Sequence, residues 1–175
     1  IKMKKLNKIQ SKCKKIKIVL TDVDGVLTDG GRYYSPKGEI LKKFHTRDGM
    51  GINILLRNAI KTVIITKENS PITNKWAKDM NVSFVYKNIQ HKEKELSKIC
   101  RKFKVSSNQI AYIGDDVNDT KLLSSVGLSA TPNDGIFTLK KTVDFVCKNN
   151  GGSGAFREFV DYILKLNFGK NIKWY

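Results

Sequence analysis

Residues 16–30 read IKIVLTDVDGVLTDG, a short apolar run that leads directly into acidic residues. The run ends at Asp22 and Asp24, and Gly25 lets the chain reverse. An open α/β sheet places its chemistry where parallel strands end. An aspartate at such a position can attack a phosphoryl centre and form an aspartyl-phosphate intermediate. The segment therefore predicts an α/β sheet with a carboxylate nucleophile at its edge.

Two further apolar segments end in residues that can hold a phosphate. Residues 62–66 form a β-branched run that ends in the hydroxyl of Thr66. Residues 84–86 form a second run, and after a polar loop Lys92 opens an amphipathic helix. A lysine at the start of a helix opposes the helix dipole, which favours an anionic partner. Each residue alone also fits a plainer role, Thr66 as a strand-ending residue and Lys92 as a solvated lysine.

A cluster of acids follows the last apolar segment. Residues 110–113 lead into Asp115, Asp116 and Asp119. Three acids within five residues repel one another unless a cation lies among them. Carboxylate oxygens suit Mg²⁺, whereas the three cysteines and two histidines lack the paired spacing of a zinc site. The sequence therefore predicts a magnesium site.

In order and context these residues resemble the four motifs of the haloacid dehalogenase superfamily of phosphohydrolases. The matching segments are 22–30, Thr66, Lys92 and 114–119. Residues 44–52 and 151–158 look like the segments that mark one branch, the 3-deoxy-octulosonate 8-phosphate phosphatases and their nine-carbon relatives. The resemblance covers roughly residues 16–166, which is nearly the whole chain.

The resemblance implies a role for each residue of the predicted site. Asp22 would be the nucleophile, and Asp24 would protonate the leaving sugar oxygen and later activate water. Mg²⁺ would be held by Asp22, Asp115 and the backbone carbonyl of Asp24. Thr66 and Lys92 would hold the non-bridging phosphoryl oxygens.

The neighbouring polar residues would support the site or bind the substrate. By the same resemblance, Asp116 and Asp119 would orient Asp115, Lys92 or metal-bound waters. The remaining substrate-binding candidates are Lys67, Glu68 and Arg47.

The sequence leaves the preferred sugar open between eight and nine carbons. In the resembled branch, Thr-Gly-Arg accompanies the eight-carbon substrate, and a glutamate after Thr-Gly appears in phosphatases of nine-carbon ulosonates, the KDN and N-acylneuraminate 9-phosphates. This chain reads Thr-Lys-Glu at residues 66–68, and Glu68 favours the nine-carbon type because an acid accepts hydrogen bonds from hydroxyls. The Arg-Asp-Gly at 47–49 favours the eight-carbon type, KDO 8-phosphate. A solvated Glu68 paired with Lys67 is an equally good interpretation.

The order of patterns predicts one α/β domain without a cap. Strand and helix patterns alternate over residues 16–168, which indicates a three-layer, Rossmann-like parallel sheet. Helix and strand patterns fill the interval from Thr66 to Lys92, so no cap domain fits there. The smaller expected parts are a loosely ordered basic arm at 1–15, a small β-hairpin flap at about 30–46 and a tail at 169–175.

An uncapped site needs another cover, because phosphoryl transfer benefits when water is excluded. Members of the resembled branch are homotetramers in which flap hairpins associate, and we expect the same here. The leading hypothesis is an Mg²⁺-dependent phosphatase that serves cell-surface sugar synthesis. The alternative is a non-catalytic tetramerisation module, because a related domain lies at the carboxyl end of animal cytidylyl-neuraminate synthetases.

The chain is strongly basic, with a formal net charge of +17. A basic surface attracts polyanions, but the lysines are spread along the chain and form no stripe interleaved with aromatic residues. We therefore expect a small anionic sugar phosphate and no nucleic acid as the partner. The absence of a long apolar run, and of an apolar secretion signal in residues 1–15, predicts no membrane partner and a cytoplasmic location.

Overall fold

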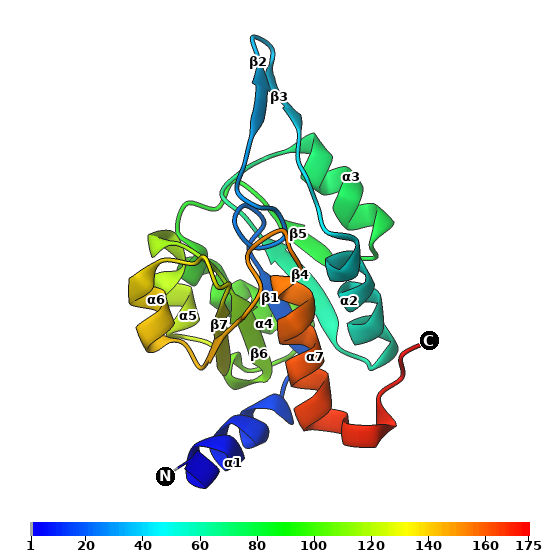
Figure 1. Ribbon diagram of the computed structural model, residues 1–175, viewed down its shortest axis with the longest axis vertical. Coiled ribbons are helices and arrows are strands. Elements are labelled where there is room, and N and C mark those ends of the chain that lie inside the picture. The colour runs from blue at the N-terminus through cyan, green and yellow to red at the C-terminus, as the bar shows by residue number, and fades with distance from the viewer. Residues whose placement is uncertain (1) are drawn as a thin grey trace.

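The fold is centred on a six-stranded parallel sheet with the strand order β5-β4-β1-β6-β7-β8 (Figure 1). The computed structural model describes the backbone of residues 2–175 and the side chains from residue 7 onward. The strands are β1 (Ile18–Thr21), β4 (Lys61–Ile65), β5 (Phe84–Tyr86), β6 (Ile110–Ile113), β7 (Leu128–Thr131) and β8 (Phe145–Val146). β1 pairs in parallel with both β4 and β6. The strands β4 and β5 therefore lie on one side of β1, and β6, β7 and β8 lie on the other. Open α/β sheets bind their ligands at the carboxyl ends of the strands where the strand order reverses in this way, which here is the carboxyl end of β1.

Helices cover both faces of this sheet, which gives the expected three layers (Figure 1). The first face carries α1 (Lys2–Cys13), α2 (Thr46–Arg57), α3 (Pro71–Asp79) and α7 (Ala155–Phe168). The second carries α4 (Leu96–Phe103), α5 (Thr120–Leu123) and α6 (Phe137–Thr142). Alternate side chains of β1 enter the two cores, Val19 the first and Leu20 the second. All four residues of β1 are buried, as expected for a strand covered on both sides.

An antiparallel hairpin projects from the sheet, at the top of Figure 1. It consists of β2 (Tyr33–Ser35) and β3 (Gly38–Leu41) and confirms the expected flap. The interval from Thr66 to Lys92 contains only α3 and β5. Neither insertion point in the described part of the chain therefore forms a cap domain.

The amino-terminal segment differs from the expected loose arm, because it forms the helix α1. Ile9 and Cys13 are buried in the core shared with α7. Lys12 Nζ lies 2.6 Å from Asp144 Oδ1, which ties the helix to the loop before β8. The prediction was wrong because the many lysines of this segment mask an apolar stripe with helical spacing. Residue 1 lies outside the described residues.

The tail at 169–175 begins with a short 3₁₀ turn, η4 (Gly169–Asn171), and then runs along α2. Asn58 Nδ2 donates to the Lys173 carbonyl at 3.0 Å, and the Lys173 N–H donates to Asn58 Oδ1 at 3.0 Å. Arg57 donates to the Trp174 carbonyl at 2.7 Å. Among the described helices, none combines the length and the apolar character needed to cross a bilayer.

Candidate active site

The centre of the site is Asp22, the first residue after β1, whose side chain is buried. Its Oδ1 accepts a hydrogen bond from the Val23 N–H at 2.7 Å, and its Oδ2 lies 2.7 Å from Lys92 Nζ. The Asp22 N–H donates to the Ile113 carbonyl at the end of β6. Burial raises the pKa of Asp22 to about 6, and the charge of Lys92 opposes this rise. The carboxylate is thus fixed at the junction of the two central strands.

Lys92 is the buried cation that contacts Asp22, with 1% of its surface exposed. It opens the 3₁₀ turn η1 (Lys92–Glu95), and its Nζ lies 2.7 Å from Asp119 Oδ1. The Tyr112 hydroxyl donates to the same Asp119 oxygen at 2.6 Å. Asp119 Oδ2 accepts the Asp115 N–H at 2.9 Å. Both carboxylate oxygens of Asp119 are therefore engaged, and the residue links Lys92 to the loop that carries Asp115.

Three carboxylates of the site lie close enough to share a cation. Ligand oxygens of Asp22, Asp115 and Asp119 lie within 4.8 Å of one another. Burial, together with the charges of Asp22 and Asp119, raises the pKa of Asp115 to about 8. The neighbouring carboxylates make it harder for Asp115 to lose a proton, and a bound cation would relieve this repulsion. Mg²⁺ suits the position because it is a hard cation that prefers oxygen ligands.

Gly25 allows this close approach. A Cβ on Gly25 would lie 2.0 Å from Asp115 Oδ2, and the residue has a φ of +88°. Only glycine meets both requirements without strain. The glycine next to Asp24 therefore leaves room for the carboxylate of Asp115 near Asp22.

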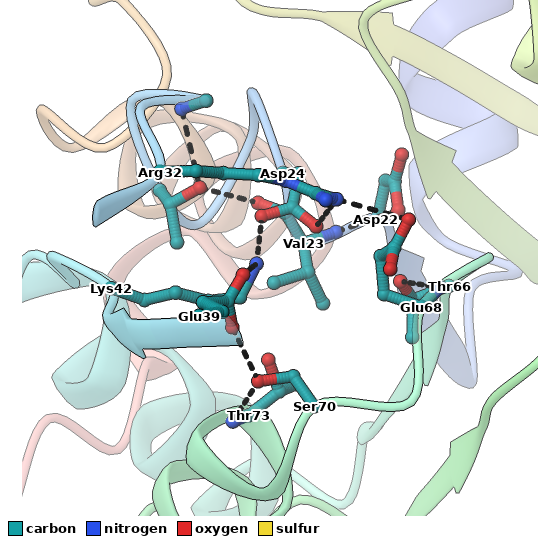
Figure 2. Close-up of polar contacts among 12 residues, drawn as sticks. Asp22, Val23, Asp24, Arg32, Glu39, Lys42, Thr66, Glu68, Ser70 and Thr73 are labelled. Atoms are coloured by element: carbon teal, nitrogen blue, oxygen red, sulfur yellow. Dashed lines mark hydrogen bonds and ion pairs between the residues drawn. The ribbon is translucent and has the colours of Figure 1, made fainter. Parts of the chain in front are cut away.

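The predicted acid Asp24 points to a different set of partners, which come from the hairpin (Figure 2). Its Oδ1 contacts Nζ of Lys42, the residue that follows β3, and its Oδ2 lies 3.7 Å from the guanidinium of Arg32, just before β2. Arg32 also pairs with Glu68 at 3.0 Å. Both ends of the hairpin thus contact the carboxylate of Asp24.

Most of the residues predicted for the site line one cavity of about 160 Å³. Its lining includes Asp22, Asp24, Thr66, Lys67, Glu68, Asp115 and Asp116. Thr66 is buried, and its Oγ1 accepts the Glu68 N–H at 3.2 Å, so the loop after β4 folds back on the strand end. The Asp116 side chain accepts the Val117 N–H at 2.7 Å and makes no hydrogen bond or ion pair with Lys92 or Asp115.

Arg47 lies outside this cavity. It is exposed at the start of α2 and lines a separate cavity of about 410 Å³ together with Ser153 and Arg157. Within one chain, the structure therefore does not bring Arg47 together with the acids.

Three residues of the site were not predicted from the sequence, namely Arg32, Lys42 and Tyr112. Tyr112 carried a usable signal, because a tyrosine in the middle of a buried strand needs a partner for its hydroxyl. Lys42 carried none, since it stands beside a second lysine, Lys43, in a chain rich in lysine. Arg32 likewise sits in a segment with no distinguishing pattern.

The chain is similar to a family of known hydrolases. A model of haloacid dehalogenase-like hydrolases matches residues 53–159. The 3-deoxy-D-manno-octulosonate 8-phosphate phosphatase KdsC of Haemophilus influenzae is 38% identical over 157 residues, which cover 90% of this chain and 87% of that protein. KdsC of Escherichia coli is 34% identical over 154 residues, 88% of this chain and 82% of that protein.

A solved structure of the corresponding phosphatase from Moraxella catarrhalis holds magnesium, phosphate and KDO. It matches with a TM-score of 0.88 at 32% identity, over 91% of this chain and 92% of that one. The chain belongs to the haloacid dehalogenase-like hydrolase family. It is a sugar-phosphate phosphatase, and its cofactor is Mg²⁺.

Proposed function

We propose that the chain hydrolyses the phosphate monoester of a 3-deoxy-2-ulosonic acid, with KDO 8-phosphate as its substrate. The proposal rests on the grouping of Asp22, Lys92 and Asp115 at one edge of the sheet. It is supported by a relative named for this activity, whose match covers 90% of the chain. The identity of the sugar is inferred from the names of the relatives, and the reaction is inferred from the arrangement of the site residues.

The reaction begins with attack of the Asp22 carboxylate on phosphorus. The bond between phosphorus and the sugar oxygen breaks, and Asp24 gives its proton to that oxygen. Lys92 and the Thr66 hydroxyl hold the non-bridging oxygens of the transferring group. Asp22, Asp115 and the Asp24 carbonyl would hold Mg²⁺, which would supply positive charge to offset the repulsion between the carboxylate and the phosphoryl group. Asp24 then takes a proton from water, which attacks the phosphorus and releases Asp22 and inorganic phosphate.

The choice between eight and nine carbons turns on Glu68. Its carboxylate pairs with Arg32 at 3.0 Å, so it is already engaged by a cation and is less free to accept sugar hydroxyls. This contact favours the eight-carbon substrate, in line with the names of the relatives. A nine-carbon KDN or N-acylneuraminate 9-phosphate is the alternative.

Phosphate release from a panel of eight- and nine-carbon ulosonate phosphates tests the proposal. We expect the highest kcat/KM with KDO 8-phosphate and no measurable turnover by Asp22→Asn. A preference for nine-carbon substrates would replace the sugar but keep the chemistry. Failure of the wild type on every sugar would favour the alternative, a non-catalytic tetramerisation module. Comparable turnover by Asp22→Asn would refute the nucleophile.

We further propose that the protein assembles into a homotetramer through its hairpins. Four large apolar side chains of the hairpin are more than half exposed, namely Tyr33, Tyr34, Ile40 and Leu41. Such a patch on a projecting element is typical of an interaction surface, and a neighbouring subunit there would cover the open cavity. Light scattering at assay concentration should give four times the chain mass, and a fully active monomer would contradict the assembly. A cytoplasmic location also stays a prediction.

A further inference from the structure

Lys42 is the most unusual charge on the leaving-group side of the site. Its side chain has no exposed surface, although it belongs to a hairpin whose neighbouring residues are largely exposed. Its Nζ contacts Asp24 Oδ1 and lies 3.2 Å from Glu39 Oε2 (Figure 2). A buried ammonium group is thus held between two carboxylates, one of which is the proton donor of the proposed reaction.

Stability alone does not account for this arrangement. Removing a lysine ammonium group from water is costly, and replacing a buried ion pair by apolar residues of similar size is often neutral or stabilising. Lys43, the next residue, shows the ordinary solution, since its side chain is 60% exposed and its Nζ lies 3.2 Å from Asp29 at the surface. The buried position of Lys42 is therefore better explained by what it contacts.

The contacts of Lys42 continue into the main domain. Glu39 Oε1 accepts a hydrogen bond from the Ser70 hydroxyl at 2.8 Å. Ser70 is the N-cap of α3, and its hydroxyl faces the Thr73 N–H (Figure 2). The chain of contacts from Asp24 through Lys42 and Glu39 thus ends on a helix that is packed against the first core. This anchor fixes the ammonium group relative to the sheet, although the hairpin itself has no residue in either buried apolar cluster.

We propose that Lys42 is a positioning residue, which holds Oδ1 of Asp24 so that Oδ2 faces the oxygen of the departing sugar. The inference rests on the proposed function, because it assumes that Asp24 transfers the proton. Without Lys42 the Asp24 side chain is free to rotate toward solvent or toward Arg32. Proton transfer depends steeply on position, and a misplacement of about 1 Å costs roughly 100-fold in rate.

A positioning role has a kinetic signature that a general structural role lacks. A sugar alkoxide needs a proton to leave, whereas p-nitrophenolate leaves without one. Loss of Lys42 should therefore slow the first chemical step only for the sugar phosphate. The second step, attack of water on the aspartyl phosphate, needs Asp24 with either substrate and should be slowed in both cases.

The test compares Lys42→Met with the wild type and with Lys43→Met as the matched control from the same hairpin. With p-nitrophenyl phosphate, Lys42→Met should release one equivalent of nitrophenolate per site in a burst at a rate within about threefold of wild type, followed by turnover roughly 100-fold slower than that of the wild type. With the sugar phosphate, kcat should fall roughly 100-fold with little change in KM, and no burst should appear. Lys43→Met should match the wild type in both assays.

Glu39→Gln gives a second variant that leaves Lys42 and Asp24 in place but loosens the anchor. It should show the same pattern with a smaller loss, roughly tenfold. Unfolding midpoints for all variants identify any that fail to fold, in which case Glu39→Gln alone decides.

Two results would overturn the positioning role. One is turnover by a folded Lys42→Met within threefold of wild type. The other is an equal loss in the first step for both leaving groups. The burst needs no sugar substrate, so it stands even if no ulosonate phosphate is hydrolysed, an outcome that would defeat the proposed function alone.

Discussion

The site has a sheet side, around Asp22, and a hairpin side, around Asp24. On each side a lysine is held against the aspartate, but the two lysines come from different parts of the fold. Lys92 meets Asp22 at the carboxyl edge of the central sheet, where Tyr112 and Asp119 complete a buried network. Lys42 meets Asp24 at the base of a hairpin that contributes no residue to either buried apolar cluster. The contacts of Asp22 thus lie at the edge of the sheet, while those of Asp24 depend on an appended hairpin. The difference suggests that the first side tolerates change far less than the second.

The largest expected effect is on the sheet side, from Asp22→Asn. The amide keeps the shape and accepts the Val23 N–H, but it is not a nucleophile. We expect kcat to fall by roughly 10⁴-fold or more, as when other covalent nucleophiles are removed. Phosphate release measures the loss, and an unchanged circular dichroism spectrum would show that the fold is intact. A loss of less than tenfold would contradict the role of the sheet side.

Lys92→Met sharpens the comparison, because it leaves the buried carboxylates of Asp22 and Asp119 without their cation. Breaking a buried pair in this way costs about 3–5 kcal/mol of unfolding free energy. Lys98→Met is the matched control, since Lys98 pairs with Glu95 nearby but is 60% exposed, and it should cost at most about 1 kcal/mol. Urea unfolding measures both values. Equal costs for the two variants would show that the sheet side is not more demanding than the surface.

Asp48 extends the comparison to a buried carboxylate without a lysine. Its Oδ1 accepts the Arg157 N–H at 2.8 Å, and its Oδ2 has no hydrogen-bond partner among the described residues. Burial raises the pKa of Asp48 from 3.8 to about 6. The folded state therefore holds this proton more tightly than the unfolded state, and stability is lost as pH rises from about 4 through 6.

Asp48→Asn should remove that loss. The difference in unfolding free energy between variant and wild type should change by up to about 3 kcal/mol between pH 4 and pH 7, in favour of the variant at the higher pH. Urea unfolding at four pH values measures it. Asp161→Asn, at a 42% exposed aspartate that also contacts Arg157, should run parallel to the wild type. Parallel profiles for Asp48→Asn as well would show that Asp48 titrates normally.

Magnesium should raise the unfolding free energy of the protein by binding the carboxylates of the sheet side. At 100 times its Kd, a ligand that binds only the folded state raises the unfolding free energy by about 2.7 kcal/mol. Because the pKa of Asp115 is raised to about 8 in the metal-free protein, binding must displace a proton below that pH, and the stabilisation should shrink as pH falls. Thermal unfolding with and without MgCl₂ measures this. Asp115→Asn should abolish the shift, while the exposed Asp79→Asn should keep it.

The smallest expected effect is that of salt on substrate binding at the open end of the cavity. Lys67 is exposed there, and the whole chain carries a formal charge of +17. Such a potential steers an anionic substrate, so kcat/KM should fall a few-fold as ionic strength rises from about 0.05 to 0.5 M, with kcat unchanged. Initial rates at low substrate concentration give the slope. A flat response would remove the steering role.

The sequence was most informative on the sheet side. Asp22, Thr66 and Asp115 each follow an apolar run, and parallel strands bring their carboxyl ends to one edge, so the grouping could be predicted without coordinates. On the hairpin side the pattern gave the hairpin but not its contacts. The pairing of β2 and β3 shifts register between Tyr33 and Tyr34, and no pattern tells which of Lys42 and Lys43 turns inward.

The helix α1 was hidden for a related reason. Its lysines suggest a solvated arm, and only tertiary packing shows that Ile9 and Cys13 reach the core. Arg47 likewise depends on packing, because its cavity is separated from the acids within one chain. Short motifs predict residues that strands deliver to an edge, but they do not predict residues that depend on how separate elements dock.

The burial of Cys13, the last residue of the amino-terminal helix α1, provides an intrinsic reporter of local opening. Its thiol is fully covered, and burial raises its pKa to about 12, whereas Cys100 on α4 is only partly covered. A thiol-specific reagent should therefore modify Cys100 first and Cys13 only when the terminal helix lifts from the domain. The ratio of the two modification rates would measure how often this end of the chain detaches, without any added label or engineered residue.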